Sequence, residues 1–342
     1  MTGRETVFAS LTFASAVMHR FPARELGWTR LAKTTPVEKP ANRTSSKFKK
    51  EIADVSNLGF GMSNPKVDYV LGHSSRELDR LSFQGTVFAP YTRQLLTEAG
   101  LTAGMRVLDV GSGGGDVSFL AADLVGQEGY VLGVDRSPAA VERARTRAIR
   151  RNLTNTSFEV GDPASMHFDI QFDAIIGRFV LMYQDDPVAS LENMMRYLRE
   201  GGLVAFQEVD STACRSWPSV PVFDQAARWL AEGLRSSGAR PELGLEMHSL
   251  YVDSGLPAPT MRIDTVVSGE RDSPVFELLA EALRSLAPTL EKLNLASAAQ
   301  LKVDTLADRM RREVVARRGV AMSYGLVGAW ARKPSMVKMA EG

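Results

Sequence analysis

The stretch Val107-Leu-Asp-Val-Gly-Ser-Gly-Gly-Gly-Asp116 decides the fold of this 342-residue chain. Its apolar start predicts a short buried strand, and the glycines after it predict a tight turn into a helix. Gly111, Gly113 and Gly115 allow backbone conformations that other residues avoid, and they let a ligand approach the main chain. Asp109 lies at the end of the strand. We therefore expect a ligand site at this turn.

A second acid follows the next predicted strand. Asp135 ends the apolar run Tyr130–Val134. Two acids around a glycine turn suit a ligand that carries a cation at one end and a ribose diol at the other, because one carboxylate can accept two hydrogen bonds. S-adenosylmethionine is such a ligand.

The main alternative is a dinucleotide site, whose fingerprint is G-x-G-x-x-G at a strand-to-helix turn. Here Asp116 stands where the third glycine belongs. An acid at the start of a helix repels the diphosphate that would bind there. The spacing favours the sulfonium nucleoside over NAD or FAD, and a purely structural turn is a further alternative.

Composition limits the class of protein. Hydrophobic residues make up 44% and charged residues 24% of the chain, and the formal net charge is +1. A net charge this close to zero produces no electrostatic field that would attract nucleic acid or an anionic membrane. The one cysteine, Cys214, excludes an internal disulfide, and no apolar run reaches the ~18–20 residues that span a bilayer. We expect a cytoplasmic protein with a small-molecule substrate; its oligomeric state is left open.

Residues 1–61 differ from the rest, with ten Lys/Arg against five Asp/Glu. They predict a disordered basic leader that the mature protein does not need. A targeting leader and a functional arm are the alternatives. Residues 62–342 are then the folded domain, with helical insertions at about 221–254 and 274–318.

The middle of the chain alternates strands with helices, which predicts a parallel sheet covered by helices on both faces. Ser137-Pro138 and Asp186-Pro187 each predict a helix start. Gly201-Gly202 predicts the end of a helix that contains Leu198. The expected strands are 105–110, 130–134, 156–160, 172–177 and 203–208.

Other helices flank this region. Ser74-Ser-Arg-Glu77 is a capping box for a helix to Ala99, which Pro90 should kink or break. After the fifth strand, the pattern predicts helices at 221–237 and 245–254, a strand at 260–267, a largely helical segment at 274–318 interrupted near Pro288, and a closing strand at 323–331. Helices inserted here would lie above the carboxyl ends of the strands, as a substrate lid or as plain packing.

Together these motifs resemble the class I S-adenosylmethionine-dependent methyltransferases. The small-molecule type similar to ubiquinone/menaquinone-biosynthesis methyltransferases fits best, and Tyr69-Val-Leu-Gly-His73 with Phe83-Gln84 resembles its N-terminal helix. The resemblance implies a doubly wound, Rossmann-like, seven-stranded sheet that is mostly parallel, with the last strand antiparallel. The motifs are Val107–Gly115, Val131–Asp135, Phe158–Asp162, Phe172–Ile176 and Leu198–Leu203.

The resemblance also implies a cofactor site. Asp109 would hold the ammonium and Asp135 both ribose hydroxyls of S-adenosylmethionine. Asp162, with Pro163 beside it, would meet the adenine amino group, and Arg136 could cover the adenine face. Three glycines would contact the cofactor through the backbone, with the first two against its methionine part: Gly111, Gly113 and Gly115.

The remaining candidates are less specific. Arg178 could clamp the cofactor carboxylate or an anionic substrate, and Gln84 could bind the same carboxylate. Methyl transfer needs a base only when the nucleophile must lose a proton. Glu208 and His73 are the favoured bases, and Glu208 should face the pocket. Tyr91, Asp210 and His248 are weaker candidates for the base, and no metal site is expected. The arginines at 143–151 lie on one predicted helix and indicate a face exposed to solvent.

We therefore expect an S-adenosylmethionine-dependent methyltransferase that transfers the methyl group to a small organic acceptor by in-line displacement. The alternatives are an NAD(P)-dependent oxidoreductase and a methyltransferase-like module that binds without turnover.

Overall fold

The structure is a computed structural model that describes residues 75–162 and 166–335. Several predicted features lie outside these residues: the leader 1–61, the Ser74 cap, the segment Tyr69–His73 and Pro163. Among the described helices, none has the length and apolar character needed to cross a membrane.

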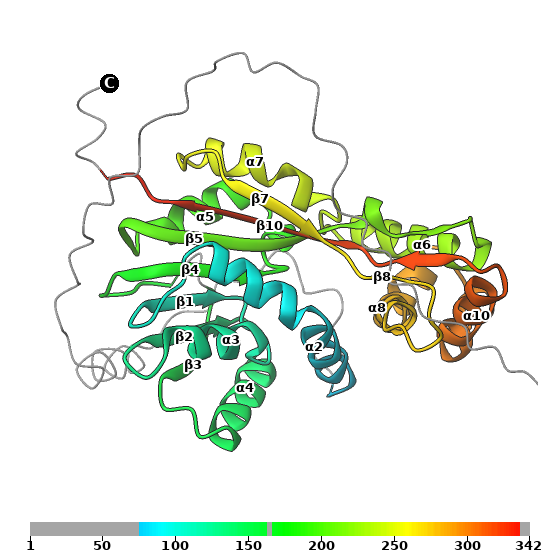
Figure 1. Cartoon of the computed structure of the whole chain (residues 1–342), viewed down its shortest axis with the longest axis horizontal. Coiled ribbons are helices and arrows are strands. Elements are labelled where there is room, and N and C mark those ends of the chain that lie inside the picture. Colours follow the sequence, from blue (N-terminus) through cyan, green and yellow to red (C-terminus); the bar gives the residue numbers. More distant parts are fainter. Residues whose placement is uncertain (1–74, 163–165, 336–342) are drawn as a thin grey trace, which may run out of the picture. The chain divides into compact units, whose positions relative to one another are not determined.

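The main sheet has seven strands in the order β3-β2-β1-β4-β5-β10-β7 (Figure 1). Strands β1 to β5 run parallel, and β10 is antiparallel to both of its neighbours. This confirms the predicted fold class, including the antiparallel last strand. The strands are β1 (Arg106–Val110), β2 (Tyr130–Asp135), β3 (Thr156–Val160), β4 (Phe172–Arg178), β5 (Leu198–Asp210), β7 (Thr260–Asp264) and β10 (Gly325–Arg332).

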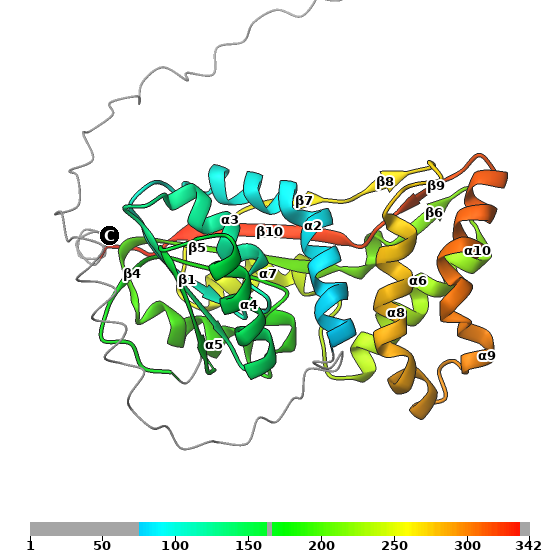
Figure 2. The same ribbon diagram turned by 90° about the horizontal axis from the view of Figure 1, so that it is seen from below.

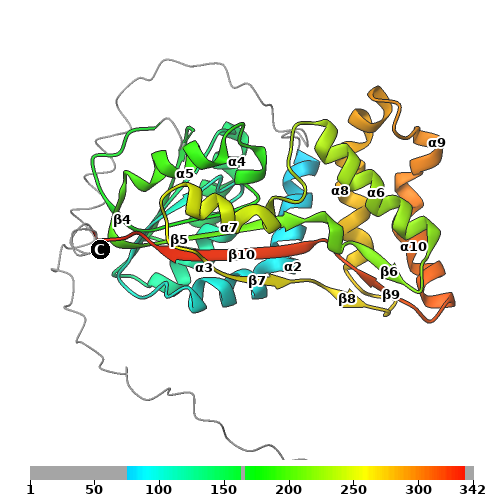
Figure 3. The same ribbon diagram turned by 90° about the horizontal axis from the view of Figure 1, so that it is seen from above.

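Helices cover both faces of this sheet, because alternate residues of a buried strand point to opposite sides. Val107 of β1 packs in one apolar cluster with α2 (Ser75–Glu98) and α3 (Asp116–Val125). Leu108 packs in another with α5 (Pro187–Met195) and α7 (Leu243–Asp253), and Figure 3 shows α7 along β5 and β10. Helix α4 (Pro138–Arg150) covers the same face as α2 and α3, and it packs on β2 and β3.

The predicted helix starts are confirmed. The Ser137 hydroxyl accepts a hydrogen bond from the backbone of Ala140, and the Asp186 carboxylate accepts one from Ala189. Each cap satisfies a backbone N–H that has no partner inside its helix, and the proline that follows needs none.

A break at Pro90, an interruption at Pro288 and a helix end at Gly201-Gly202 are wrong, whereas the alternative of a kink at Pro90 stays a prediction. Pro90 and Pro288 are exposed, and α2 and α8 (Val275–Lys292) continue through them because their buried faces hold each helix together. Gly201-Gly202 does not end a helix: α5 ends at Met195, and the glycine pair lies inside β5, where the register to β4 shifts. A glycine pair can mark such a bulge as well as a helix end.

A smaller three-stranded sheet extends the molecule beyond β5, in the order β6 (Arg215–Trp217), β9 (Val320–Met322), β8 (Val267–Ser268). The predicted strand at 260–267 thus divides between two sheets, whereas the predicted closing strand at 323–331 corresponds to β10 alone. The helices α6 (Pro221–Ser236), α8 and α10 (Val303–Ala316) pack beside it, and Figure 2 shows α2 lying between them and the main sheet; the short α9 (Ala298–Leu301) joins α8 to α10.

The predicted insertion 221–254 is therefore not one unit. Its first helix, α6, packs against α8, while its second, α7, covers β5 and β10 of the main sheet. Two short 3-10 helices, η1 (Leu181–Tyr183) and η2 (Ser211–Ala213), follow β4 and β5.

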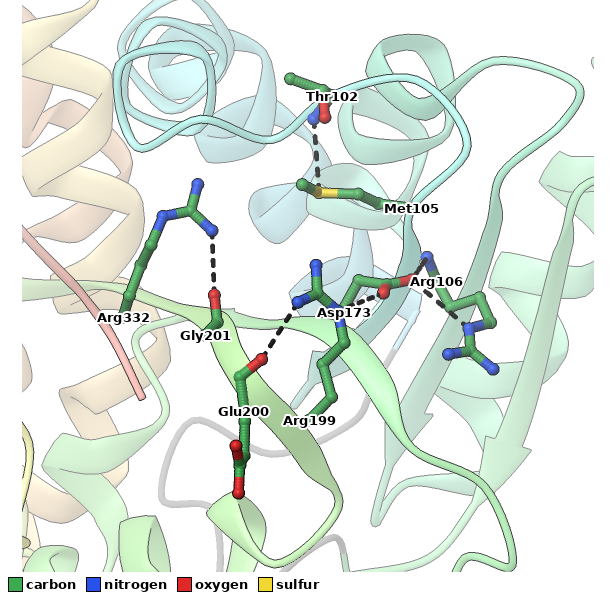
Figure 4. Close-up of polar contacts among 8 residues, drawn as sticks. All are labelled: Thr102, Met105, Arg106, Asp173, Arg199, Glu200, Gly201 and Arg332. Carbon is green, nitrogen blue, oxygen red and sulfur yellow. Dashed lines mark hydrogen bonds and ion pairs between the residues drawn. The ribbon is translucent and has the colours of Figure 1, made fainter. Parts of the chain in front are cut away.

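The amino ends of the central strands are tied together by ion pairs (Figure 4). Asp173 is 8% exposed and receives hydrogen bonds from the backbone and side chain of Arg106 and from Arg199. The Arg332 guanidinium donates to the carbonyl of Gly201 across the same edge. These contacts fix strand ends opposite the glycine turn, so they serve the sheet and leave the carboxyl ends free for a ligand.

Candidate functional site

A cavity of about 400 Å³ lies at the carboxyl ends of the parallel strands. Open sheets of this type bind ligands there, at the point where the strand order reverses. The order reverses between β1 and β4, and residues from the ends of β2, β3 and β4 line the cavity together with the glycine turn. Residues of α2, α6 and α8 close the other side.

The glycine turn depends on backbone conformations that favour glycine. Gly111 has φ 62° and Gly113 has φ 52°, and both line the cavity. A Cβ on Gly111 would lie 2.7 Å from a methyl group of Val180. Gly115 (φ 88°) packs differently: a Cβ there would meet the rings of Phe119 and Phe158, and Gly115 is not among the cavity-lining residues. This position therefore needs glycine for the close packing of α3, and the ligand contact of Gly115 stays a prediction.

Asp135 is anchored beside this turn. One carboxylate oxygen accepts the backbone N–H of Gly113 and the other accepts that of Ser137, each at 2.8 Å. The side chain is half-buried and lines the cavity. Each carboxylate oxygen can accept a second bond, so the residue suits a vicinal diol.

Asp109 is more deeply buried, at 1% exposure. Its Oδ2 accepts from the Ser118 hydroxyl at 2.5 Å, while its Oδ1 has no hydrogen-bond partner among the described residues. Burial raises the pKa of this carboxyl to about 7. Arg178 and Asp135, its charged neighbours, both line the cavity. The free oxygen could accept a hydrogen bond from an ammonium group, but Asp109, unlike Arg178 and Asp135, is not among the cavity-lining residues.

The third strand contributes Asp162, which lines the cavity with Arg136. The two side chains form an ion pair at 2.7 Å, and the same guanidinium nitrogen lies 3.4 Å from Gln184 Oε1. The predicted pair of residues is thus brought together at one end of the cavity.

Asp116 and the α4 arginines give an unexpected contact. Asp116 lines the cavity at the start of α3, and Arg147 donates to its carboxylate at 2.6 Å and to the Gly114 carbonyl. Arg143 reaches across to Asp79 of α2. The prediction of a solvated arginine face is therefore wrong for these side chains, which hold the glycine turn and α2 in place.

Arg178 and Gln84 line the cavity from β4 and α2. The Arg178 guanidinium donates to the Thr92 hydroxyl at 2.9 Å, and burial lowers its pKa. Gln84 accepts from Arg80 at 2.6 Å, and Arg80 in turn forms a two-oxygen ion pair with Glu77. Arginine stays charged in such surroundings, so two cations line this part of the cavity: Arg80, which is buried, and Arg178, which is half-buried.

The expectation that Glu208 faces the pocket is wrong. It is fully buried, it does not line the cavity, and its carboxylate accepts the backbone N–H groups of Val180, Leu181 and Met182. Burial raises its pKa to about 7. The residue holds the chain after β4 in place, and this position keeps it from acting directly on a substrate.

The other predicted bases do not gather at the site either. His248 is exposed on α7, and Asp210 caps η2 through Thr212. His73 lies outside the described residues. No cluster of three or more His, Cys, Asp or Glu side chains within residues 75–162 and 166–335 is arranged to hold a metal ion.

Several lining residues had no sequence signal. Leu230 and Leu234 of α6 and Ala282 of α8 read only as positions on the apolar face of a helix. Tyr324 lies just before β10, and its ring packs edge-on against Phe88 and Phe179. Phe179, directly after β4, also lines the cavity and has φ 57°, a backbone conformation that no sequence pattern predicts for it.

Comparisons with known proteins agree with this geometry. Residues 101–239 match a family model described as a methyltransferase domain. Aklanonic acid methyltransferase DauC of Streptomyces sp. (strain C5) is 35% identical over 142 residues, which are 41% of this chain and 64% of that protein. Demethylmenaquinone methyltransferase of Staphylococcus aureus is 30% identical over 165 residues, 47% of this chain and 64% of that protein.

The chain thus spans less than two thirds of the length of these relatives. Among solved structures, a putative methyltransferase from Bacillus halodurans is 18% identical, with a TM-score of 0.48 over 71% of this chain and 99% of that one. The predicted resemblance is confirmed by the family match and the two sequence relatives.

Proposed function

We propose that the protein transfers the methyl group of S-adenosylmethionine to a small organic acceptor, since residues 101–239 match a family model of a methyltransferase domain. The observation that carries this proposal is the arrangement of acids around the glycine turn. Asp135 offers oxygens to a diol, Asp109 keeps a buried oxygen without a partner, and Asp116 stands at the helix start where a diphosphate would bind.

These residues fit S-adenosylmethionine part by part. Asp135 would hold the ribose hydroxyls, Asp109 the ammonium, and Asp162 with Arg136 the adenine. Arg178 is the nearest candidate for the carboxylate of the methionine part, because it is a cation beside Asp109 on the cavity wall. The bound cofactor would supply an electrophilic methyl group on a positively charged sulfur.

The protein's own contribution would be alignment and exclusion of water. The backbone of Gly111 and Gly113 would fix the methionine part, while α2, α6 and α8 close the cavity above it. In-line displacement needs the acceptor atom, the methyl carbon and the sulfur in a row, and a walled cavity can enforce that alignment.

The cellular setting is part of the same proposal. Cys214 is a buried free thiol, which supports a reducing, cytoplasmic compartment. The site is a cavity of about 400 Å³, a size that supports a small molecule over a nucleic acid as the substrate. We also propose that the described part of the chain is one catalytic domain and that the leader is dispensable for it.

Calorimetric titration of the purified chain tests the cofactor. We expect S-adenosylhomocysteine to bind and NAD(H) not to bind; the opposite result would contradict the proposal and favour the oxidoreductase. Labelled-methyl transfer to a metabolite extract then separates an enzyme from a non-catalytic binding module.

A further inference from the structure

The cavity has two halves. The strand ends and the glycine turn within residues 109–162 form a polar half, where the proposed function places the cofactor. The apolar half is lined by side chains of η1, β5, α6 and α8: Met182, Val209, Leu230, Leu234 and Ala282. Arg178, at the end of β4, is the cation that the proposed function assigns to the cofactor carboxylate. Whether it can bind a carboxylate depends on what holds its guanidinium in place.

Arg178 lacks the usual partner of a half-buried arginine. Among the residues that the structure describes, no carboxylate forms an ion pair with its guanidinium. Its acidic neighbours, Asp109 and Asp116, are engaged elsewhere. Asp109 accepts from Ser118 at 2.5 Å, and Asp116 pairs with Arg147 at 2.6 Å. The positive charge of Arg178 is therefore only partly compensated, and a charge withdrawn from water needs a partner.

A hydroxyl holds Arg178 instead. Its Nη1 donates to Thr92 Oγ1 at 2.9 Å, and the Thr92 hydroxyl donates to Gln207 Oε1 at 2.7 Å. Thr92 on α2 is 2% exposed and Gln207 on β5 is 1% exposed, and neither lines the cavity. Because a guanidinium can only donate, the Thr92 oxygen must accept and its hydrogen must point to Gln207. The chain of hydrogen bonds thus has one direction, and it fixes one nitrogen of Arg178.

Gln207 offers little to the fold apart from this contact. Its Nε2 is buried and has no hydrogen-bond partner among the described residues. A buried donor without a partner destabilises a protein, and an apolar side chain at this position would avoid that cost. The bond to Thr92 is the one hydrogen bond that the Gln207 side chain makes within the described part of the chain. The polar end of this side chain therefore serves to orient the Thr92 hydroxyl.

A neutral partner suits an arginine that binds an anion. A carboxylate in place of Thr92 would orient the guanidinium but would also neutralise it, whereas a hydroxyl orients it and leaves its charge for a ligand. The N–H groups of Arg178 that do not face Thr92 have no acceptor among the described residues, and the residue lines the cavity. A planar fork with one fixed nitrogen presents its other donors in a fixed plane, which matches the two oxygens of a carboxylate.

We propose that Thr92 is a positioning residue for the cofactor: its hydroxyl, held by Gln207, aims the Arg178 guanidinium at the carboxylate of S-adenosylmethionine. This inference rests on the proposed function and extends it to a side chain that does not touch the ligand. Arg80, Leu81 and Gln84 of the same helix line the cavity. Helix α2 therefore both closes the site and orients its cation.

The test compares two ligands by calorimetric titration of the full chain: S-adenosylmethionine, and decarboxylated S-adenosylmethionine, which lacks only the carboxylate. We expect the wild type to bind S-adenosylmethionine about 10- to 100-fold more tightly, the range for hydrogen bonds to a charged group. Thr92→Val keeps the shape of the side chain and removes the hydroxyl. In this variant the preference should fall about 3- to 10-fold, with unchanged affinity for the decarboxylated ligand.

Thr92→Ser is the matched control, because it keeps the hydroxyl and should keep the preference. Gln207→Met removes the acceptor of the Thr92 hydroxyl and should also lower the preference, so it provides the test if Thr92→Val does not fold. A merely structural role of Thr92 would weaken both ligands alike and leave their ratio unchanged.

Three results would overturn the positioning role: a full preference in Thr92→Val, a full preference in Gln207→Met where Thr92→Val does not fold, or equal binding of the two ligands by the wild type. A wild type that binds neither ligand contradicts the proposed function itself, and the positioning role with it. The two failures are therefore distinguished by the wild-type titrations alone.

Discussion

The two halves of the cavity are built in different ways. The polar half comes from residues 109–162, a short stretch whose acids lie at or near the ends of β1, β2 and β3 and at the start of α3. The apolar half collects one or two side chains from each of several elements between Leu81 and Tyr324. The residues proposed to bind the cofactor are therefore close together in the sequence. The residues of the apolar half come together only because distant helices pack against one another.

Glu208 belongs to neither half, and its replacement should have the largest effect on stability. Glu208→Leu leaves three buried N–H groups after β4 without an acceptor, each costing about 1–3 kcal/mol, so we expect a loss of about 3 kcal/mol or more in the free energy of unfolding. Urea denaturation measures it.

Glu208→Gln is the matched control, because its remaining oxygen can still accept from Val180 and Leu181. It should cost about 1 kcal/mol and keep methyl transfer, since the side chain does not reach the cavity. A stable Glu208→Gln variant without turnover would indicate that Glu208 acts as a base. It would contradict the distinction between residues that line the cavity and residues that support its wall.

The second prediction concerns the polar half alone. Asp135→Ala removes the charged partner of two ligand hydroxyls, so affinity for S-adenosylhomocysteine should fall by about 1–3 kcal/mol in calorimetry. Asp169→Ala, an exposed acid away from the cavity lining, is the control. Unchanged binding in Asp135→Ala would contradict the ribose assignment.

The same division explains what the sequence could predict. Asp109, Asp135 and Asp162 could be proposed from the sequence because strand ends and turns are recognisable from neighbouring residues. Glu208 was misplaced because a residue near a strand end can point into the core as readily as into a cavity, and only the packing of η1 against β5 decides.

Tyr324 and the α6 side chains were missed for a related reason. Leu230 and Leu234 repeat with helical period, which predicts a buried face and not what that face meets. The Tyr324 ring packs against the rings of Phe88 and Phe179, which lie far away in the sequence. Long-range packing places these groups, and no local pattern records it.

The smallest expected effect is a pH dependence within the polar half. Burial raises the pKa of Asp109 to about 7, and a ligand ammonium favours the ionised form. Below pH 7 the carboxyl must first lose a proton, so affinity for S-adenosylhomocysteine should weaken as pH falls, by at most about tenfold per pH unit. Titrations at pH 8 and pH 6 should therefore differ by about tenfold.

Asp109→Asn should abolish most of that difference, because the amide does not titrate, and its affinity at pH 8 should be lower than that of the wild type. Asp162→Asn is the control, since it changes a cavity carboxylate but leaves Asp109 intact, and its slope between pH 8 and pH 6 should match the wild type. If the slope survives in Asp109→Asn, the ammonium is held elsewhere. Asp109 would then serve only the packing of α3 against β1. The acids that bind the ligand would begin at Asp135.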